Sequence, residues 1–175
     1  MIVHVRDADA ADAGACAQVY APYVRDTAIS FEVTAPSALQ MAQRIEDAQR
    51  RHAWLVAQDE QGVLLGYAYA HPYAARPAYR WTCEPSVYLA PDARGRGVGR
   101  TLYAALLDRL VERGFRQAVA GVTLPNPASL RLHEAMGFEP VGVFRAVGWK
   151  HGRWHDVARL QRPLLLAPDP PQEIV

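Results

Sequence analysis

The sequence predicts an α/β fold in which one mixed, twisted sheet carries helices on both of its faces. Three observations predict it. Segments of strand periodicity and of helix periodicity alternate along the 175 residues. Asp59–Gly62 is a hairpin turn between two strands, so these neighbours are antiparallel. In the second half of the chain helices separate the strands, as they do in parallel crossovers.

Composition and charge limit the classes of protein to consider. Half of the residues are apolar (50%), which is ordinary for a soluble domain, and the net charge of +1 gives no reason to expect a nucleic-acid partner. Cys16 and Cys83 are too few for a disulfide framework, which favours a reducing cytoplasm. Without a signal peptide or an apolar run of about 18 residues, we expect no membrane span. We expect one domain over residues 1–166 and a proline-rich, disordered tail at 167–175.

The first third of the chain is expected to form one strand and two helices. The strand ends at Arg6, and a helix over about residues 9–26 follows. Pro22 favours a kink or a break in that helix. A second helix opens at Ser37 and runs to about Arg51. Its inward side is expected to carry Leu39, Ile45 and Ala48.

Three strands are expected in the middle of the chain. Trp54–Ala57 and Val63–Ala70 flank the hairpin turn. Gly66 favours a bulge or a close approach of another backbone. After a loop over His71–Tyr79, Arg80–Leu89 forms the long central strand.

Helices and strands alternate again in the last part of the chain. We expect a helix from Val98 to Gly114, a strand over Phe115–Leu124, a helix from Asn126 to Gly137, and closing strands over about 141–150 and 154–165. In the first of these helices apolar residues recur every four positions. Asn126 is a good N-cap, and Pro127 suits the first helical position.

A stretch rich in glycine and arginine, Arg94-Gly95-Arg96-Gly97-Val98-Gly99-Arg100, joins the central strand to the next helix. Glycines let a ligand approach the backbone, and the free N–H groups of a first helical turn favour anions. The arginines add positive charge, so the stretch predicts a phosphate-binding loop; the alternative is a flexible turn before a surface helix. The spacing matches neither the dinucleotide fingerprint G-x-G-x-x-G nor the phosphate loop G-x-x-x-x-G-K-[ST].

The pattern Arg-Gly-x-Gly-x-Gly after a strand resembles the pyrophosphate loop of the GNAT acetyltransferase superfamily. Residues 75–84, 124–138 and 148–157 resemble its phosphinothricin and methionine sulfoximine/sulfone acetyltransferases, so the resemblance covers most of the chain. The run Lys-His-Gly-Arg-Trp-His-Asp-Val is its most specific part. Arg80 departs from the acid typical of the herbicide-resistance enzymes, and the last strand, at Ala158-Arg159-Leu160, is less aromatic. Both departures bear on the substrate.

The resemblance implies transfer of the acetyl group of acetyl-CoA to the α-amino group of a small amino acid analogue, without a metal. It further implies a homodimer and a role in herbicide or antibiotic resistance. Two alternatives stay open: a GNAT enzyme acting on a peptide N-terminus or a polyamine, and a non-catalytic sensor that binds acyl-CoA.

Two residues are candidates for the proton transfers of that reaction. The resemblance places a catalytic glutamate at Glu84, as a base acting through a water; the alternative is a carboxylate paired with Arg76 or Arg80. His133 stands where many GNAT enzymes carry a tyrosine acid, and it is a candidate acid or base, or a structural histidine. His133-Glu134 does not begin a zincin motif, because Gly137 replaces the second histidine.

For the cofactor, the resemblance implies that the backbone of Val87, Tyr88 and Leu89 pairs with the pantetheine amides like an added strand. An N–H near Leu89 is the expected donor to the thioester carbonyl oxygen. Arg94, Gly95, Arg96, Gly97, Val98, Gly99 and Arg100 are expected to hold the pyrophosphate. Asn126 resembles the family's pantetheine contact, a role compatible with that of a helix cap.

For the acceptor, we expect Arg76, and as a second candidate Arg80, to bind a carboxylate, since a guanidinium fork suits one. Phe31, Tyr79 and Trp81 are expected to wall the pocket. The alternative is that these arginines face solvent.

Overall fold

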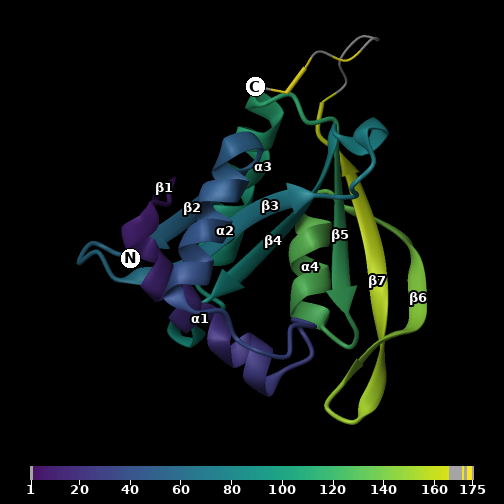
Figure 1. Ribbon diagram of the computed structural model, residues 1–175, viewed down its shortest axis with the longest axis horizontal. Helices are drawn as coiled ribbons and strands as arrows, with labels where there is room; N and C mark the ends of the chain where they lie inside the picture. Colours follow the sequence, from purple (N-terminus) through teal and green to yellow (C-terminus); the bar gives the residue numbers. More distant parts are fainter. Residues whose placement is uncertain (1, 166–170, 172, 175) are drawn as a thin grey trace.

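The computed structural model describes residues 2–165, 171, 173 and 174. It contains one sheet of seven strands in the order β1-β2-β3-β4-β5-β7-β6, with helices on both faces (Figure 1). The predicted fold class is therefore confirmed. The tail expected at 167–175 lies mostly outside the described residues.

The strands are β1 (His4–Asp7), β2 (Ala53–Gln58), β3 (Leu64–Pro72), β4 (Thr82–Leu89), β5 (Gln117–Thr123), β6 (Glu139–Lys150) and β7 (Arg153–Pro163). The helices are α1 (Ala13–Asp26), α2 (Ala38–Arg51), α3 (Val98–Glu112) and α4 (Pro127–Ala135), with short 3-10 turns at Ala10–Asp12, Pro77–Tyr79 and Pro91–Ala93. The sheet is mixed, because β4 and β5 are parallel and the other neighbours are antiparallel.

Each face of the sheet has its own core. On one face α1 and α2 pack against β2 and β3, where Trp54 stacks on Tyr67 with ring centroids 5.0 Å apart. On the other face α3 buries the apolar residues that recur every four positions, including Leu102 and Leu106. Helices from the first third of the chain therefore cover one face of the sheet, and α3 covers the other.

Three local expectations differ from the structure, in whole or in part. Leu39 is 82% exposed, because the buried stripe of α2 runs through Met41, Ile45 and Ala48 instead. Pro22 does not break α1, which continues from Ala13 to Asp26. Residues 71 and 72, expected in a loop, extend β3 because they pair with β4.

The parallel strands β4 and β5 separate after a short paired stretch (Figure 1). They pair at Thr82 with Gln117 and at Cys83 with Ala118, and no further along either strand. The next residue of β4 on that edge is Pro85, which has no N–H to continue the ladder. A proline in a central strand is thus accommodated, because it stands where the two strands part.

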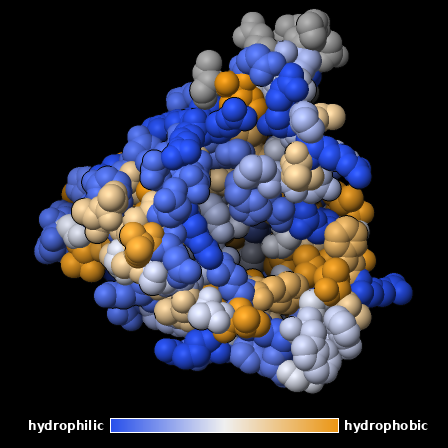
Figure 2. All heavy atoms as spheres, in the orientation of Figure 1, coloured by the Kyte–Doolittle hydropathy of each residue, from blue (hydrophilic) through white to orange (hydrophobic). Residues whose placement is uncertain are grey.

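The sheet ends in an unusually exposed strand. β6 is the outer edge of the sheet, and Val143, Phe144 and Trp149 on it are 49%, 57% and 58% exposed. Figure 2 shows apolar side chains gathered at the position of β6, beside a hollow in the middle of this face. An apolar edge strand of this kind is suited to contact another chain.

Candidate active site

A narrow cleft lies where β4 and β5 separate, with a volume of about 60 Å³. β4 contributes Val87, β5 contributes Gly121, and α4 contributes Asn126 and His133. Ile29, from the segment that joins α1 to α2, also lines it. The structure thus brings together candidate residues from several distant parts of the chain.

One backbone edge of β4 faces this cleft. The N–H of Ala90, just past the strand, donates to the carbonyl of Leu65 on β3 (2.9 Å). Because backbone groups alternate sides along a strand, those of Val87 and Leu89 point the other way, into the split. At Leu89 the Tyr23 hydroxyl donates to the carbonyl (2.7 Å) and accepts from the N–H (3.1 Å). The edge open to an added strand is therefore at Val87.

Two backbone groups that were expected at this edge have other partners in the structure. The backbone of Tyr88 faces β3, where its register partner is Tyr67, and its ring packs edge-on against Tyr20 at 4.7 Å. The N–H of Leu89, expected to hold a carbonyl oxygen, already donates to Tyr23. Tyr23 is thus a member of the site that sequence reasoning missed.

The loop after β4 places an anion-binding helix end beside the cleft. Gly95 and Gly97 have φ angles of 70° and 82°, a region that favours glycine. Gly97 is the N-cap of α3, so the N–H groups of the first turn are presented there. Arg94 lies over the Tyr23 ring (4.9 Å), and Arg96 donates to the carbonyl of Asp92 (3.2 Å).

The first turn of α3 is pressed against the end of β4. Val98 and Gly99 are buried, and a Cβ at Gly99 would lie 3.1 Å from Leu89 Cδ1. Arg100 is exposed on the same turn. The N-terminal end of α3 therefore packs directly on the end of β4, two residues beyond the free edge at Val87.

His133 is held from both sides. Nδ1 lies 2.8 Å from the Ser129 carbonyl, which can only accept, so Nδ1 carries a proton. In the neutral ring Nε2 then accepts from the Tyr103 hydroxyl (3.1 Å). Burial lowers the pKa of His133 below its usual range. At neutral pH His133 is an uncharged imidazole locked between α3 and α4.

Asn126 caps α4, since its Oδ1 accepts from the Ser129 N–H (3.1 Å). The helix cap predicted from the sequence is confirmed. Because Asn126 also lines the cleft, its amide group remains on the wall that faces β4.

Glu84 forms an ion pair with Arg159, not with Arg76 or Arg80. Nη1 of Arg159, on β7, donates to Oε1 of Glu84 (2.9 Å), and the two side chains are 17% and 21% exposed. They meet over Gly121, which lies on β5 between their strands and also lines the cleft. A Cβ at Gly121 would lie 2.6 Å from Arg159 Nη1 and 3.3 Å from Glu84 Oε1. The glycine leaves the room in which this pair forms.

Phe31 is positioned by a buried ammonium group. Lys150 donates to the carbonyls of Val24 (2.6 Å), Ser30 (2.6 Å) and Glu32 (2.8 Å), so it holds both ends of the segment around Phe31. The Phe31 ring lies on Gly148, where a Cβ would overlap it. The segment that carries Ile29 and Phe31 is therefore fixed to β6 near the cleft.

Three of the other acceptor candidates, Arg76, Tyr79 and Arg80, line a second pocket of about 430 Å³. Arg80 pairs with Glu173 (2.8 Å) and lies 3.9 Å over the Trp81 ring. The structure does not bring this group to the cleft.

One aromatic contact links the second pocket to the ion pair. The Tyr79 ring packs edge-on against Tyr73 at 5.5 Å, and the Arg159 guanidinium lies 6.0 Å from the Tyr73 ring. Among the residues expected to bind the acceptor, Tyr79 is therefore connected to Glu84 by a series of contacts through Tyr73 and Arg159.

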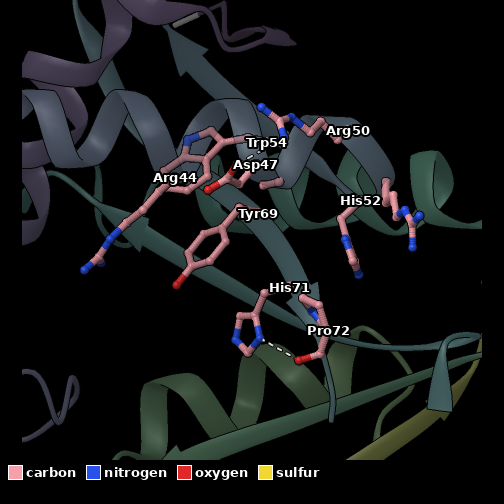
Figure 3. Close-up of a pocket in the computed structure, with 10 residues that line it drawn as sticks. Arg44, Asp47, Arg50, His52, Trp54, Tyr69, His71 and Pro72 are labelled. Carbon is pink, nitrogen blue, oxygen red and sulfur yellow. Dashed lines mark hydrogen bonds and ion pairs between the residues drawn. The ribbon is translucent and has the colours of Figure 1, made fainter. Parts of the chain in front are cut away.

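A third pocket, of about 460 Å³, lies between α2 and β3 (Figure 3). Tyr69 and His71 project into it from β3, and His71 is the register partner of Glu84. Arg44 lines it from α2, but both of its terminal nitrogens are bound to the Glu32 carboxylate, at 2.7 and 2.9 Å. This pocket therefore borders β3, the strand next to the one that carries Glu84.

Both thiols are buried away from solvent. Burial raises the pKa of Cys16 and of Cys83 to about 12, so neither is a thiolate at neutral pH. Among residues 2–165, 171, 173 and 174 there is no group of three or more side chains suited to hold a metal ion. In the same residues no helix has the length and apolar character needed to cross a membrane.

Comparison with known proteins shows the family of the chain. The sequence model of the acetyltransferase (GNAT) family matches residues 20–138. Phosphinothricin N-acetyltransferase of Streptomyces viridochromogenes is 41% identical, covering 98% of this chain and 93% of its own. The L-methionine sulfoximine/L-methionine sulfone acetyltransferase of Pseudomonas paraeruginosa is 37% identical over 92% of this chain and 94% of its own.

A solved structure extends the comparison to the fold. The GNAT phosphinothricin acetyltransferase of Sinorhizobium meliloti, solved with AcCoA, superposes with a TM-score of 0.93 at 41% identity, covering 99% of this chain and 96% of its own. The chain belongs to the GNAT acetyltransferase family. It is an acetyltransferase by family, and the resemblance inferred from its sequence is confirmed.

Proposed function

We propose that this enzyme acetylates the α-amino group of a small amino acid analogue of the phosphinothricin or methionine sulfone/sulfoximine type, with acetyl-CoA as donor. The observation that carries the proposal is the position of Glu84, a carboxylate beside Gly121, which lines a cleft with a free strand edge near the N-terminal end of α3. Relatives at 37% and 41% identity carry these activities in their names.

The residues present fit acetyl-CoA. Val87 offers an unpaired strand edge to the pantetheine amides, Asn126 faces it, and the glycine loop with the first turn of α3 suits the pyrophosphate. Bound acetyl-CoA supplies an acetyl thioester, whose C–S bond breaks as the amide bond to the acceptor nitrogen forms.

Glu84 is the group suited to remove a proton from the acceptor ammonium, directly or through a water. His133 is neutral, and both of its ring nitrogens are engaged with Tyr103 and Ser129. Its proposed role is therefore to shape the cleft wall and to pass a proton only together with Tyr103.

We further propose that the enzyme is a cytoplasmic homodimer that serves resistance to such compounds. Exposed apolar residues on the edge strand β6, with Trp149 and Trp154 in edge-on contact at 5.3 Å, support an interface between two copies. The mass of the protein in solution tests this part.

The test of the activity is thiol release from acetyl-CoA against phosphinothricin, methionine sulfone, methionine sulfoximine, ordinary amino acids, polyamines and a short peptide. We expect turnover to be confined to the first three. Turnover with only a peptide or a polyamine would contradict the acceptor, and tight acetyl-CoA binding without turnover would favour a sensor.

The variant Glu84→Gln tests the assigned base. Because a general base contributes about 10²- to 10⁴-fold, kcat should fall by that factor while acetyl-CoA affinity is unchanged. Calorimetric titration with acetyl-CoA provides the binding control. A variant with undiminished kcat would remove Glu84 from the reaction.

A further inference from the structure

We propose that Arg159 binds the carboxylate of the acceptor, and that the Glu84–Arg159 ion pair is the site at which the zwitterionic acceptor binds. The inference rests on the proposed function and deepens it, since it names the residue that selects α-amino acids. It follows from a juxtaposition that the sequence does not announce: β7 and β4 supply opposite charges over a glycine of β5.

The position of the guanidinium is the first argument. Arg159 Nη1 lies 2.9 Å from Glu84 Oε1, and both groups border Gly121, which lines the cleft. A group bound to Arg159 is therefore within reach of the carboxylate assigned as base. The two side chains are 17% and 21% exposed, so a small ligand can reach them while bulk water is largely kept away.

The unused donors of Arg159 are the second argument. Its contact with Glu84 uses one terminal nitrogen, whereas Arg44 on the same face of the sheet is bound through two nitrogens to both oxygens of Glu32. Within the described part of the chain, Glu84 is the one carboxylate that Arg159 contacts. A guanidinium has five N–H donors, so Arg159 can also receive a carboxylate in the two-pronged manner.

The walls around the guanidinium are the third argument. The rings of Tyr73 and Phe144 each lie 6.0 Å from it, from the β3–β4 connection and from β6. Aromatic faces attract the cation and restrict its movement, and the low polarity strengthens a charge-assisted hydrogen bond. These rings favour a planar anion bound at the edge of the guanidinium.

An α-amino acid is complementary to this ion pair. Its ammonium and carboxylate are joined through one carbon. The ammonium is opposite in charge to the carboxylate of Glu84, and the carboxylate is opposite in charge to the guanidinium of Arg159. When the acceptor carboxylate takes over the Arg159 donors, Glu84 is released to face the ammonium whose proton it must accept. Acceptors without an anionic group next to the amine would leave Glu84 paired with Arg159.

Arg76 and Arg80 are less suited to this role. Arg80 is paired with Glu173 and stacked over Trp81, and Arg76 lines the same separate pocket. Neither lines the cleft that contains Gly121, whereas Arg159 and Glu84 lie over that glycine.

The experiment compares methionine sulfone with its α-carboxamide, which has the same side chain but no carboxylate. We would measure kcat/KM for both acceptors in the wild type, Arg159→Met, Arg159→Lys and Arg76→Met. Comparing the ratio of the two values between the variants and the wild type cancels the different basicity of the two amines. Arg109→Met is the matched control, because Arg109 forms an exposed ion pair with Asp7 (2.6 Å) toward the opposite edge of the sheet.

We expect Arg159→Met to lower kcat/KM for the acid by about 50-fold or more, as for loss of a charge-assisted pair, with the amide changed less than threefold. Arg159→Lys should recover part of the preference, while Arg109→Met should keep it. In the wild type, the acid but not the amide should raise the melting temperature. This rise should disappear in Arg159→Met, which gives a readout independent of turnover.

Three results would overturn the inference. An equal loss for acid and amide in Arg159→Met would give Arg159 a general role in holding Glu84. A loss of preference in Arg76→Met, with none in Arg159→Met, would move the carboxylate site to Arg76. If the wild type acetylates neither acceptor, the proposed function fails and the inference fails with it, whereas in the first two cases only the inference fails.

Discussion

Glycines decide which side chains can meet around the cleft. Gly121 leaves room for Glu84 and Arg159, and Gly148 leaves room for the Phe31 ring. At both positions the atoms that a Cβ would meet belong to side chains. A substitution there should therefore move a functional side chain and leave the strand in place.

Gly148→Ala should displace the Phe31 ring, because the added Cβ would overlap it. We expect the KM for the acceptor to rise by about tenfold, the loss of a contact of about 1.4 kcal/mol, with the KM for acetyl-CoA unchanged. Steady-state kinetics with each substrate varied in turn would measure this.

Gly142→Ala is the matched control, since Gly142 lies on the same strand and its added Cβ would have nothing within 4 Å. Equal effects of the two substitutions would show that Phe31 does not wall the acceptor site.

Among the structural elements, the segment between α1 and α2 depends on a group supplied by β6. Lys150 is 6% exposed and donates to three carbonyls of that segment and of α1. The same segment is tied to α2 through the bond pair between Glu32 and Arg44. Two separate anchors thus hold a connection that has no regular structure of its own.

Lys150→Met should leave three carbonyls without their donor and lower the free energy of unfolding by about 3 kcal/mol. The acceptor KM should rise more than the acetyl-CoA KM, because Phe31 loses its support. Urea unfolding and steady-state kinetics would measure the two effects. Unchanged stability would contradict the anchoring role.

Arg44→Met, which removes the second anchor but leaves the buried ammonium in place, allows the two contributions to be separated. Because Arg44 and Glu32 are 42% and 35% exposed, the loss from this substitution should be smaller.

For the whole molecule, two buried histidines link stability to pH. Burial, with the positive charges of His71, Arg113 and Arg51, lowers the pKa of His52 from 6.5 to about 4. Burial also lowers the pKa of His133. Both groups are neutral in the folded protein and take up protons on unfolding at mildly acidic pH.

The stability due to His52 should be complete above pH 6.5 and lost as the pH falls from 6.5 toward 4, a change of about 3 kcal/mol. Urea unfolding of the wild type and of His52→Gln across this range would measure it. The variant should show a shallower fall, and parallel curves would contradict the assignment.

The sequence predicted most of the fold because periodicity and turn signals are local. The hairpin at Asp59–Gly62, the cap at Asn126 and the glycine end of α3 were each readable from a few neighbouring residues. The exposure of Leu39 was not, because it depends on which side of α2 meets the sheet.

The candidate site was predictable only in part, because several of its contacts join residues that are far apart in sequence. Glu84 and His133 stood out through the family resemblance. His133 lines the cleft, and Glu84 lies beside Gly121, which also lines it. Tyr23, Tyr103 and Arg159 did not stand out, because each acts through a contact with a strand or helix far away in sequence. From the sequence, Arg159 was only part of a last strand that is less aromatic than in the family.

The buried ammonium of β6 has one more consequence. Lys150 is the only lysine among the 175 residues, and its three N–H donors are taken up by carbonyls. Thioesters slowly acylate exposed lysines without any enzyme, and this protein offers them no free lysine amine. The long cationic side chains on its surface are arginines. The one lysine of this acetyltransferase is therefore protected from acylation by acetyl-CoA.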